Sequence, residues 1–211
     1  MPDRTDSLDQ LFAQISAKRP DIVEFRMDKL KDSDSAVVIG HKKTFPAIAA
    51  HRTLENPTGR NDLLLAAAKS GFEYVDIDQA WPDAKNLAER CRATGANIIA
   101  SAHNFQRTPT QRQLSTMLNS MREVPADICK IVTTATHPRD NLVILNFLED
   151  KSRAAKLVSF AMGSLGIPSR ILSPLYGAEF TFAALSPESK TAEGQLTIDD
   201  LRGAWKLLGI Q

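Results

Sequence analysis

The chain has 211 residues, of which 43% are hydrophobic, enough for one substantial core but too few for two ordinary domains. We therefore expect a single domain spanning residues 1–211. The 26 basic and 25 acidic residues nearly cancel, so no global charge attracts nucleic acid or an anionic membrane. A small molecule is the expected partner.

The two cysteines and the absence of long apolar runs indicate in which cellular compartment the protein is expected. Cys91 and Cys129 show no metal-ligand or Cys-x-x-Cys spacing, which argues against a disulfide framework and against a structural zinc site. Met1 to Asp6 is polar where a signal peptide would be apolar, and no later run approaches the length needed to span a bilayer. We expect a cytoplasmic protein.

Short apolar runs alternate with stretches of helical periodicity along the whole chain, which is typical of successive βα units. Several of the apolar runs are continuous, as strands covered on both faces must be. The predicted strands are Ile22 to Met27, Ala47 to His51, Tyr74 to Ile77, Asn97 to Ala102, Ile128 to Val132, Leu157 to Met162 and Phe180 to Leu185. The predicted helices cover about Ser7 to Lys18, Arg60 to Ser70, Asp83 to Thr94, Thr110 to Arg122, Pro138 to Lys151 and Thr197 to Leu208.

Capping residues and glycines support these helix boundaries. Helix starts are indicated at Thr108 to Thr110, at His137-Pro138 and at Thr197 to Asp200, where a cap or a proline precedes the periodic stretch. Gly71, Gly95 and Gly209 lie where a helix should end.

The order of elements places the chain in the α/β class. Seven strands with parallel connections are consistent with a (β/α)8 TIM-type barrel whose first strand is missing or poorly represented, since residues before the first helix hold no strand-like run. An open doubly wound sheet has the same alternation, and periodicity alone does not distinguish the two.

Polar residues recur where predicted strands end, and in a barrel these positions converge on the active-site face. In chain order they are Glu24, Arg26, Arg52, Asp76, Asp78, His103 and Lys130, with Arg170 further along the chain. Each has a structural alternative: an acid at a strand end often caps the next helix, and a single arginine more often forms a surface ion pair.

Lys130 lies between Ile128-Cys129 and Ile131-Val132, inside a buried-strand pattern where a charge is costly. On an edge strand it would merely be solvated. In a dry barrel mouth, desolvation would favour the neutral amine, which can attack a carbonyl carbon. That is the chemistry of a Schiff-base lysine.

His103 ends a strand-like run, and its imidazole titrates near neutrality, which suits a general acid and base. A lone histidine is more often structural, and Asp76 on the preceding strand could orient its ring. His41, His51 and His137 show no spacing that would make a metal site with it. Arg26, Arg52 and Arg170 would offer forked donors to an anionic substrate, and Glu24 could be buried against one of them.

Six segments in this order resemble the type I 3-dehydroquinate dehydratases, from about residue 7 to the C-terminus. No single segment would suffice, but their common order is specific. They are DIVEFRMD at 21–28, YVDID at 74–78, SAHNFQRTP at 101–109, DICKI at 127–131, AMGSLGIPSR at 161–170 and TAEGQ at 191–195.

The resemblance implies a lyase that needs no cofactor or metal and dehydrates 3-dehydroquinate to 3-dehydroshikimate in the shikimate pathway, which serves aromatic amino acid biosynthesis. Lys130 would form the Schiff base, His103 would act as general acid and base in a syn elimination, and Asp76 would support the histidine. Arg170 would pair with the substrate carboxylate. Residues matching the other substrate contacts are Glu24, Arg26, Arg52, Thr191 and Gln195 for polar groups, and Met162 and Phe182 for the apolar walls.

Some positions depart from the family pattern. Where the family usually has Arg-x-x-x-Glu-Gly-Gly, this chain has RTLENP at residues 52–57. Neither Glu55 nor Asn56 is therefore assigned the role of the family's glutamate. The family has a lid segment with the sequence Ser-Ala-Pro-Gly-Gln, which corresponds to residues 191–195. Thr191 stands at its serine position, and Glu193 stands at its proline position. If the first strand is missing, a homodimer is one way in which a neighbouring subunit could complete the barrel.

Two alternatives stay open at the level of sequence. Another Schiff-base barrel lyase or aldolase would keep Lys130 but would need phosphate-binding glycines in its last loops, a role for which Gly163 and Gly166 are the candidates. A non-catalytic sensor of the same fold would bind a pathway metabolite without turnover.

Overall fold

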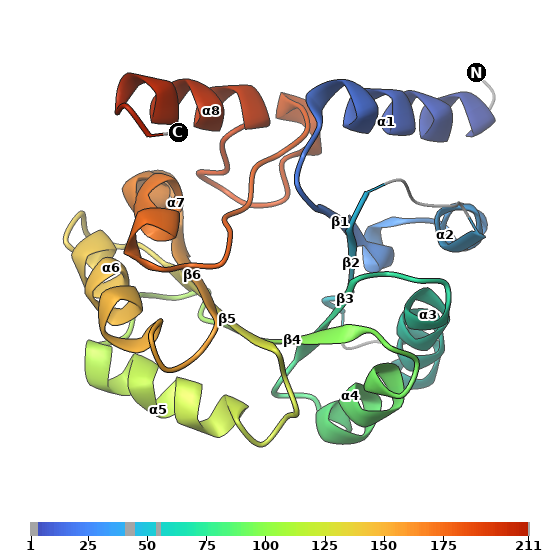
Figure 1. Ribbon diagram of the computed structural model, residues 1–211, viewed down its shortest axis with the longest axis horizontal. Helices are drawn as coiled ribbons and strands as arrows, with labels where there is room; N and C mark the ends of the chain where they lie inside the picture. The colour runs from blue at the N-terminus through green and yellow to red at the C-terminus, as the bar shows by residue number, and fades with distance from the viewer. Residues whose placement is uncertain (1–3, 41–44, 54–55, 211) are drawn as a thin grey trace. The chain divides into compact units, whose positions relative to one another are not determined.

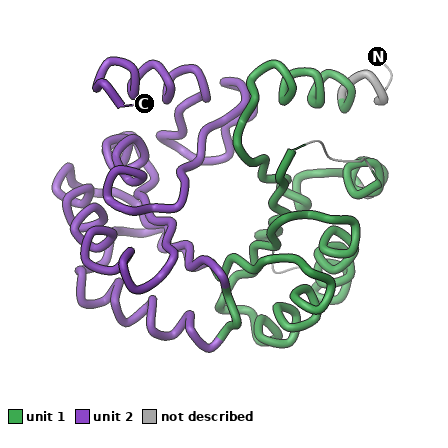
Figure 2. Tube along the Cα trace, viewed as in Figure 1, with its two compact units in different colours: residues 1–100, 124–126 green, residues 101–123, 127–211 purple. Residues whose placement is uncertain are grey.

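The computed structural model describes residues 4–40, 45–53 and 56–210. Within this part of the chain, strands and helices alternate as the sequence predicts (Figure 1). The chain divides into two compact units, shown in Figure 2. The first comprises Met1–Ala100 with Val124–Ala126, and the second comprises Ser101–Glu123 with Asp127–Gln211. The expectation of one domain over residues 1–211 stays a prediction.

The first unit contains three complete parallel strands and the helices that precede and follow them. β1 pairs with β2, and β2 pairs with β3, both in parallel. Its elements are α1 (Arg4–Lys18), β1 (Val23–Arg26), α2 (Asp32–Gly40), β2 (Ala47–Ala50), α3 (Pro57–Lys69), β3 (Tyr74–Asp78) and α4 (Ala84–Arg92). All four residues of β2 are buried, which explains its uninterrupted apolar sequence.

The second unit continues the same alternation. β5 and β6 pair in parallel over six residue levels, from Cys129 opposite Leu157 to Thr134 opposite Met162. Its elements are α5 (Gln111–Met121), β5 (Ile128–Thr134), α6 (Asp140–Lys151), β6 (Leu157–Met162), α7 (Ile167–Leu172) and α8 (Ile198–Leu207). β4 (Asn97–His103) begins in the first unit and ends in the second.

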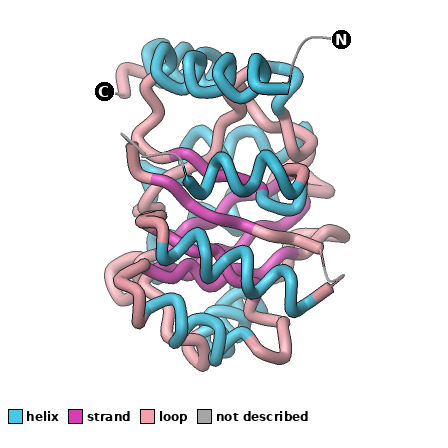
Figure 3. Tube along the Cα trace, turned by 90° about the vertical axis from the view of Figure 1, so that its right-hand side faces the viewer, coloured by secondary structure: helices cyan, strands magenta, loops and turns pink. Residues whose placement is uncertain are grey.

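The strand order distinguishes the two α/β architectures that the sequence left open. The six strands follow one sheet in chain order, β1-β2-β3-β4-β5-β6. A doubly wound sheet reverses direction at a switch point, so its order is not sequential, whereas each strand of a (β/α)8 barrel lies beside the next one in the chain. The chain therefore has the α/β fold of the TIM-barrel type. Figure 3 shows the strands in magenta and the helices in cyan.

Six of the seven predicted strands are confirmed, and the seventh is wrong as a continuous strand. In place of a strand at Phe180 to Leu185, the chain makes isolated parallel bridges, Ala178 with Leu157 and Ala184 with Thr197. The segment starts beside β6, where the Glu179 N–H donates to the Leu157 carbonyl at 2.8 Å. Within the segment, the Thr181 hydroxyl donates to the Arg170 carbonyl at 2.9 Å, and the next bridge is the isolated one at Ala184.

All six predicted helices form, and most predicted caps are present. Thr110 and Thr197 each form a capping box at the start of α5 and α8. α6 begins instead at Asp140, whose carboxylate accepts N–H bonds from Thr136 and His137. The predicted stops Gly71, Gly95 and Gly209 all have positive φ, the conformation that ends a helix.

Two helices of the structure, α2 and α7, were not predicted from the sequence pattern. α2 contains Ala36 followed by Val37, Val38 and Ile39, which are poor helix formers, so its pattern did not indicate a helix. α7 has six residues, less than two turns. At the N-terminus, α1 already begins at Arg4, so residues 4–18 hold no strand, and residues 1–3 lie outside the described part.

Candidate active site

The nucleophile candidate Lys130 lies in the interior of the sheet. Lys130 belongs to β5, which lies between β4 and β6, and its side chain is only 4% exposed. The solvated edge-strand alternative is therefore wrong. Its Nζ lies 4.0 Å from the ring centroid of Phe182.

His103 and Lys130 lie on the same face of the sheet. The Asn104 N–H donates to the Val132 carbonyl at 2.8 Å. In a parallel ladder this bond sets His103 level with Val132, two residues beyond Lys130 along β5. Because alternate residues share a face, both side chains project to the same side within the second unit. The His103 ring stacks against Phe105, with centroids 5.8 Å apart.

Arg170 is a buried cation beside β6. It lies on α7 with 2% exposure, and its guanidinium carbon is 4.4 Å from the ring centroid of Phe160. Among the residues that the structure describes, its Nε and Nη2 find no hydrogen-bond partner. Burial lowers the pKa of Arg170 to about 10, so the group is still charged at neutral pH.

A buried cation with unused donors is costly unless an anion completes the site. Phe160 is level with Val132 in the β5–β6 ladder, on the face that carries Lys130. The second unit thus places a buried amine, an imidazole and a partly unsatisfied guanidinium on adjoining elements. That combination suits a small substrate with a carbonyl and a carboxylate.

The remaining predicted residues of the second unit are found on β6 and the loops. Met162 ends β6, level with Thr134. Thr191 and Gln195 bind one another, with the Thr191 N–H donating to Gln195 Oε1 at 2.8 Å. This segment contacts the end of β6, where the Gly163 N–H donates to the Glu193 carbonyl at 3.1 Å.

Close backbone contacts explain why two positions in this region, 166 and 194, are glycines. A Cβ on Gly166 would lie 2.4 Å from the Ala161 carbonyl oxygen, and one on Gly194 would lie 2.2 Å from that of Gly163. Backbone contact with Ala161 therefore accounts for Gly166 without the phosphate ligand that an aldolase would need.

The first unit holds a second group of predicted residues, joined by ion pairs. Arg52 donates to both carboxylate oxygens of Asp76, at 2.9 Å for Nη1 to Oδ1, with Nη2 paired to Oδ2. Burial acts to lower the pKa of Arg52, but attraction and hydrogen bonds from Asp76 raise it above its usual value, with Glu24 adding to the effect. Asp76 is completely buried.

Arg26 forms a similar fork with Asp28, at 2.9 Å and 2.7 Å. The sequence reasoning did not foresee either pairing, although Asp28 follows Arg26 by two residues. Strand register places Arg26, Ala50 and Asp76 level with one another, so Glu24, Arg26 and Asp76 share one face. Asp76 belongs to the first unit and His103 to the second, so the support of the His103 ring by Asp76 stays a prediction.

The altered loop after β2 is only partly described. Glu55 lies outside the described residues. Asn56 is the N-cap of α3 and accepts from the Gly59 N–H at 3.1 Å.

His51 precedes Arg52 and is a buried residue to which the sequence pattern assigned no functional role. It is 8% exposed, and its Nδ1 has no hydrogen-bond partner within the described residues. Burial lowers the pKa of His51, while Asp28 acts in the opposite direction. No group of three or more His, Cys, Asp or Glu residues that could hold a metal occurs in the described part of the chain.

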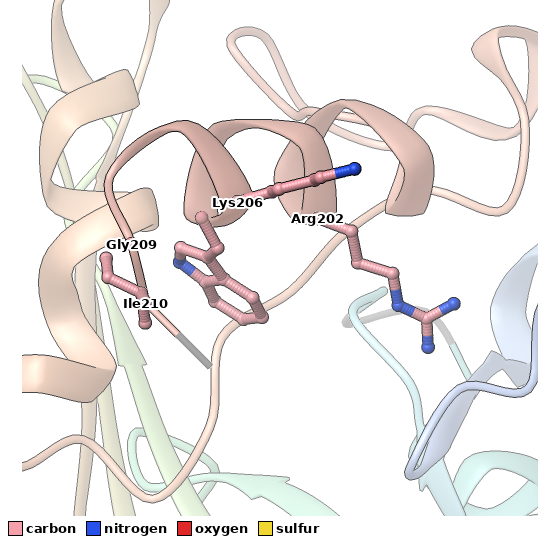
Figure 4. Close-up of a pocket in the computed structure, with 5 residues that line it drawn as sticks. Arg202, Lys206, Gly209 and Ile210 are labelled. Atoms are coloured by element: carbon pink, nitrogen blue, oxygen red, sulfur yellow. The ribbon is translucent and has the colours of Figure 1, made fainter.

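A separate hollow of about 370 Å³ lies at the C-terminal end of α8 (Figure 4). Its walls are Arg202, Trp205, Lys206, Gly209 and Ile210, none of which the sequence predicted as a site residue.

In the described residues, no helix is both long enough and apolar enough to cross a bilayer.

Comparison with known proteins bears on these observations. The family model described as Type I 3-dehydroquinase matches residues 2–211. A 3-dehydroquinate dehydratase of Pyrococcus abyssi is 33% identical over 217 residues, which cover 97% of this chain and 95% of that protein. One from Dehalococcoides mccartyi strain 195 is 42% identical over 139 residues, covering 66% of this chain and 62% of that relative's length.

The fold also matches solved structures. The crystal structure of 3-dehydroquinate dehydratase from Geobacillus kaustophilus aligns with a TM-score of 0.81 at 26% identity. The alignment covers 93% of this chain and 83% of that one.

Proposed function

Because the chain belongs to the type I 3-dehydroquinase family, we propose that it dehydrates 3-dehydroquinate to 3-dehydroshikimate in the shikimate pathway, through a Schiff base on Lys130. The observation that carries this proposal is the buried amine of Lys130 on one sheet face with His103. A lysine kept from water inside a sheet needs a chemical reason, and imine formation supplies one.

The amine of Lys130 attacks the C3 ketone, and loss of water leaves an iminium ion. This cation withdraws electrons from C2, so the C2 proton becomes acidic enough for His103 to remove it. His103 then returns the proton to the departing C1 hydroxyl, which leaves as water. Hydrolysis of the imine releases the product and restores Lys130.

The substrate carboxylate pairs with Arg170, whose two unsatisfied nitrogens are donors for it. Met162 and Phe182 form apolar walls, and Thr191 and Gln195 bind hydroxyl groups. Glu24, Arg26 and Arg52 complete the polar contacts in this proposal, and Asp76 supports His103. The ion pairs of Arg52 and Arg26 hold each guanidinium in a fixed orientation, which limits the cost of ordering it on binding.

Borohydride reduction in the presence of 3-dehydroquinate tests the proposal. We expect intact-mass spectrometry to show one reduced substrate adduct, and peptide mapping to place it on Lys130. Lys130→Ala should abolish the adduct and the turnover, whereas Lys156→Ala, a change at an exposed lysine before β6, should leave both intact. Wild-type protein that gains no adduct at Lys130 would contradict the assignment.

Turnover separates the enzyme from the sensor. We expect enone absorbance to rise when 3-dehydroquinate is added. Tight binding of quinate-like acids with no rise in absorbance would favour a metabolite sensor instead.

We also propose that the protein acts in the cytoplasm and forms a homodimer. The two cysteines are free thiols, as a reducing compartment would keep them. Light scattering coupled to size exclusion would measure the mass, and a monomer at micromolar concentration would contradict the dimer.

A further inference from the structure

The aromatic ring of Phe182 lies over the amine of Lys130. The centroid of the ring is 4.0 Å from Nζ, well within the range of a cation–π contact. Lys130 is 4% exposed, so little water reaches this amine. Desolvation strengthens the attraction between a cation and an aromatic face.

Neighbouring aromatic side chains hold the Phe182 ring in place. The Phe160 ring tilts against it at a centroid distance of 5.9 Å, and Phe180 meets it edge to face at 5.5 Å. The adjacent Thr181 hydroxyl donates to the Arg170 carbonyl at 2.9 Å, which fixes the backbone beside the ring. The ring face is therefore oriented before any substrate arrives.

We propose that Phe182 is a positioning residue that stabilises the positive charge on the Lys130 nitrogen throughout the Schiff-base cycle. The inference rests on the proposed function in taking Lys130 as the nucleophile. It gives Phe182 an electrostatic role in addition to that of an apolar wall.

The charge on this nitrogen appears twice in the cycle. One cationic form is the ammonium, the protonated form of the free amine. After deprotonation, the nitrogen lone pair attacks the ketone carbon and forms the C–N bond. Loss of the carbonyl oxygen as water then leaves a C=N bond with the positive charge on nitrogen, one proton being consumed for each water released. The ring is negative at its face, so it attracts both cations and has little effect on the neutral amine.

Two opposite effects follow when the face of the ring is made less negative. The ammonium is stabilised less, so a larger fraction of Lys130 is the neutral amine, and Lys130 should react faster with a small acylating reagent at a fixed pH. The iminium ion loses stabilisation, so dehydration should slow. A wall that acted only by shape would produce neither trend.

A fluorination series at Phe182 isolates the electrostatic part. Replacing Phe182 with 4-fluoro-, 3,5-difluoro- and 3,4,5-trifluorophenylalanine withdraws electron density stepwise with little change in ring size. We expect kcat to fall at each step, reaching on the order of ten-fold, with a smaller change in KM. The same series at Phe147, a completely buried residue of α6, serves as the control and should leave kcat unchanged.

Acetylation provides a readout that does not depend on the proposed substrate. Acetic anhydride turns the neutral amine into an uncharged amide without passing through an iminium ion. The reaction would be followed at Lys130 by peptide mass spectrometry, and we expect its rate to rise with fluorine number. Absence of this trend overturns the inference, whether or not the protein dehydrates 3-dehydroquinate. If the acetylation trend appears and wild-type protein forms no 3-dehydroquinate adduct, the contact with the ring stands and the proposed function fails. If kcat shows no trend in an active enzyme, the catalytic role of the ring is excluded.

Discussion

The residues that matter for chemistry differ in how well sequence context predicts their surroundings. Lys130 is flanked by apolar residues, and burial follows directly because a strand covered on both faces leaves no room for water. His103 and Lys130 share a face because of strand register, which depends on backbone hydrogen bonds between separate segments. The ion pairs of Arg52 with Asp76 and of Arg26 with Asp28 could not be predicted from the sequence, since several acids lie near each arginine along the chain or on neighbouring strands.

His103→Ala tests the assigned proton transfer at the residue scale. The variant should still form a Schiff base, since the amine is intact, but turnover should fall by roughly two to four orders of magnitude. Borohydride trapping and steady-state rates measure the two steps separately. His137→Ala is the matched control, because His137 is exposed in the turn before α6, and it should behave as wild type. Near-normal turnover by His103→Ala would exclude the ring as the acid–base group.

At the element scale, regular periodicity predicted well and short irregular segments did not. The six confirmed strands and helices have strong apolar patterns or recognisable caps. The wrong strand at Phe180 to Leu185 has a strand-like composition, yet the chain makes isolated bridges at Ala178 and Ala184 instead of a continuous ladder. A continuous ladder depends on the backbone partners that the fold brings beside a segment, and local sequence does not reveal them.

The segment Thr191 to Gln195 depends on close backbone packing at Gly194. Gly194 has φ of +73°, and a Cβ there would lie 2.2 Å from the Gly163 carbonyl oxygen. Gly194→Ala should therefore displace the segment from the end of β6 and lower kcat/KM for 3-dehydroquinate by up to about 10²-fold.

Gly203→Ala is the control for this change. Gly203 lies inside α8, where an added Cβ meets nothing within 4 Å. We expect it to raise the free energy of unfolding by about 0.5–1 kcal/mol in urea titrations, with unchanged kinetics. Wild-type kinetics in Gly194→Ala would show that the contact with Gly163 has no part in catalysis.

For the molecule as a whole, buried titratable groups should make stability fall on acidification. Burial lowers the pKa of His51 in the folded state, so below about pH 6.5 the unfolded chain takes up a proton first. Stability is then lost as pH falls from there through the lowered pKa. For Asp28, burial acts to raise the pKa, but the hydrogen bond and charge of Arg26 lower it overall. Its contribution is present above its unfolded value of about 3.8 and disappears at lower pH.

Urea unfolding between pH 7 and pH 5 measures the contribution of His51 to the pH dependence of the free energy of unfolding. His51→Gln should flatten the decline in unfolding free energy over this range, because each unit of pKa difference is worth about 1.4 kcal/mol. His137→Gln, at an exposed histidine, should keep the wild-type slope. An unchanged slope in His51→Gln would place the acid sensitivity elsewhere.

The sequence by itself determined the alternation of strands and helices, the α/β class and the family, because periodicity, caps and ordered motifs are properties of local segments. It also singled out Lys130, His103 and Arg170. Only the tertiary structure decided that the strands follow one another in sheet order, which separates the barrel type from the doubly wound sheet. Register, ion pairing and the Phe182 ring over Lys130 likewise required the fold, since they join residues far apart in the chain.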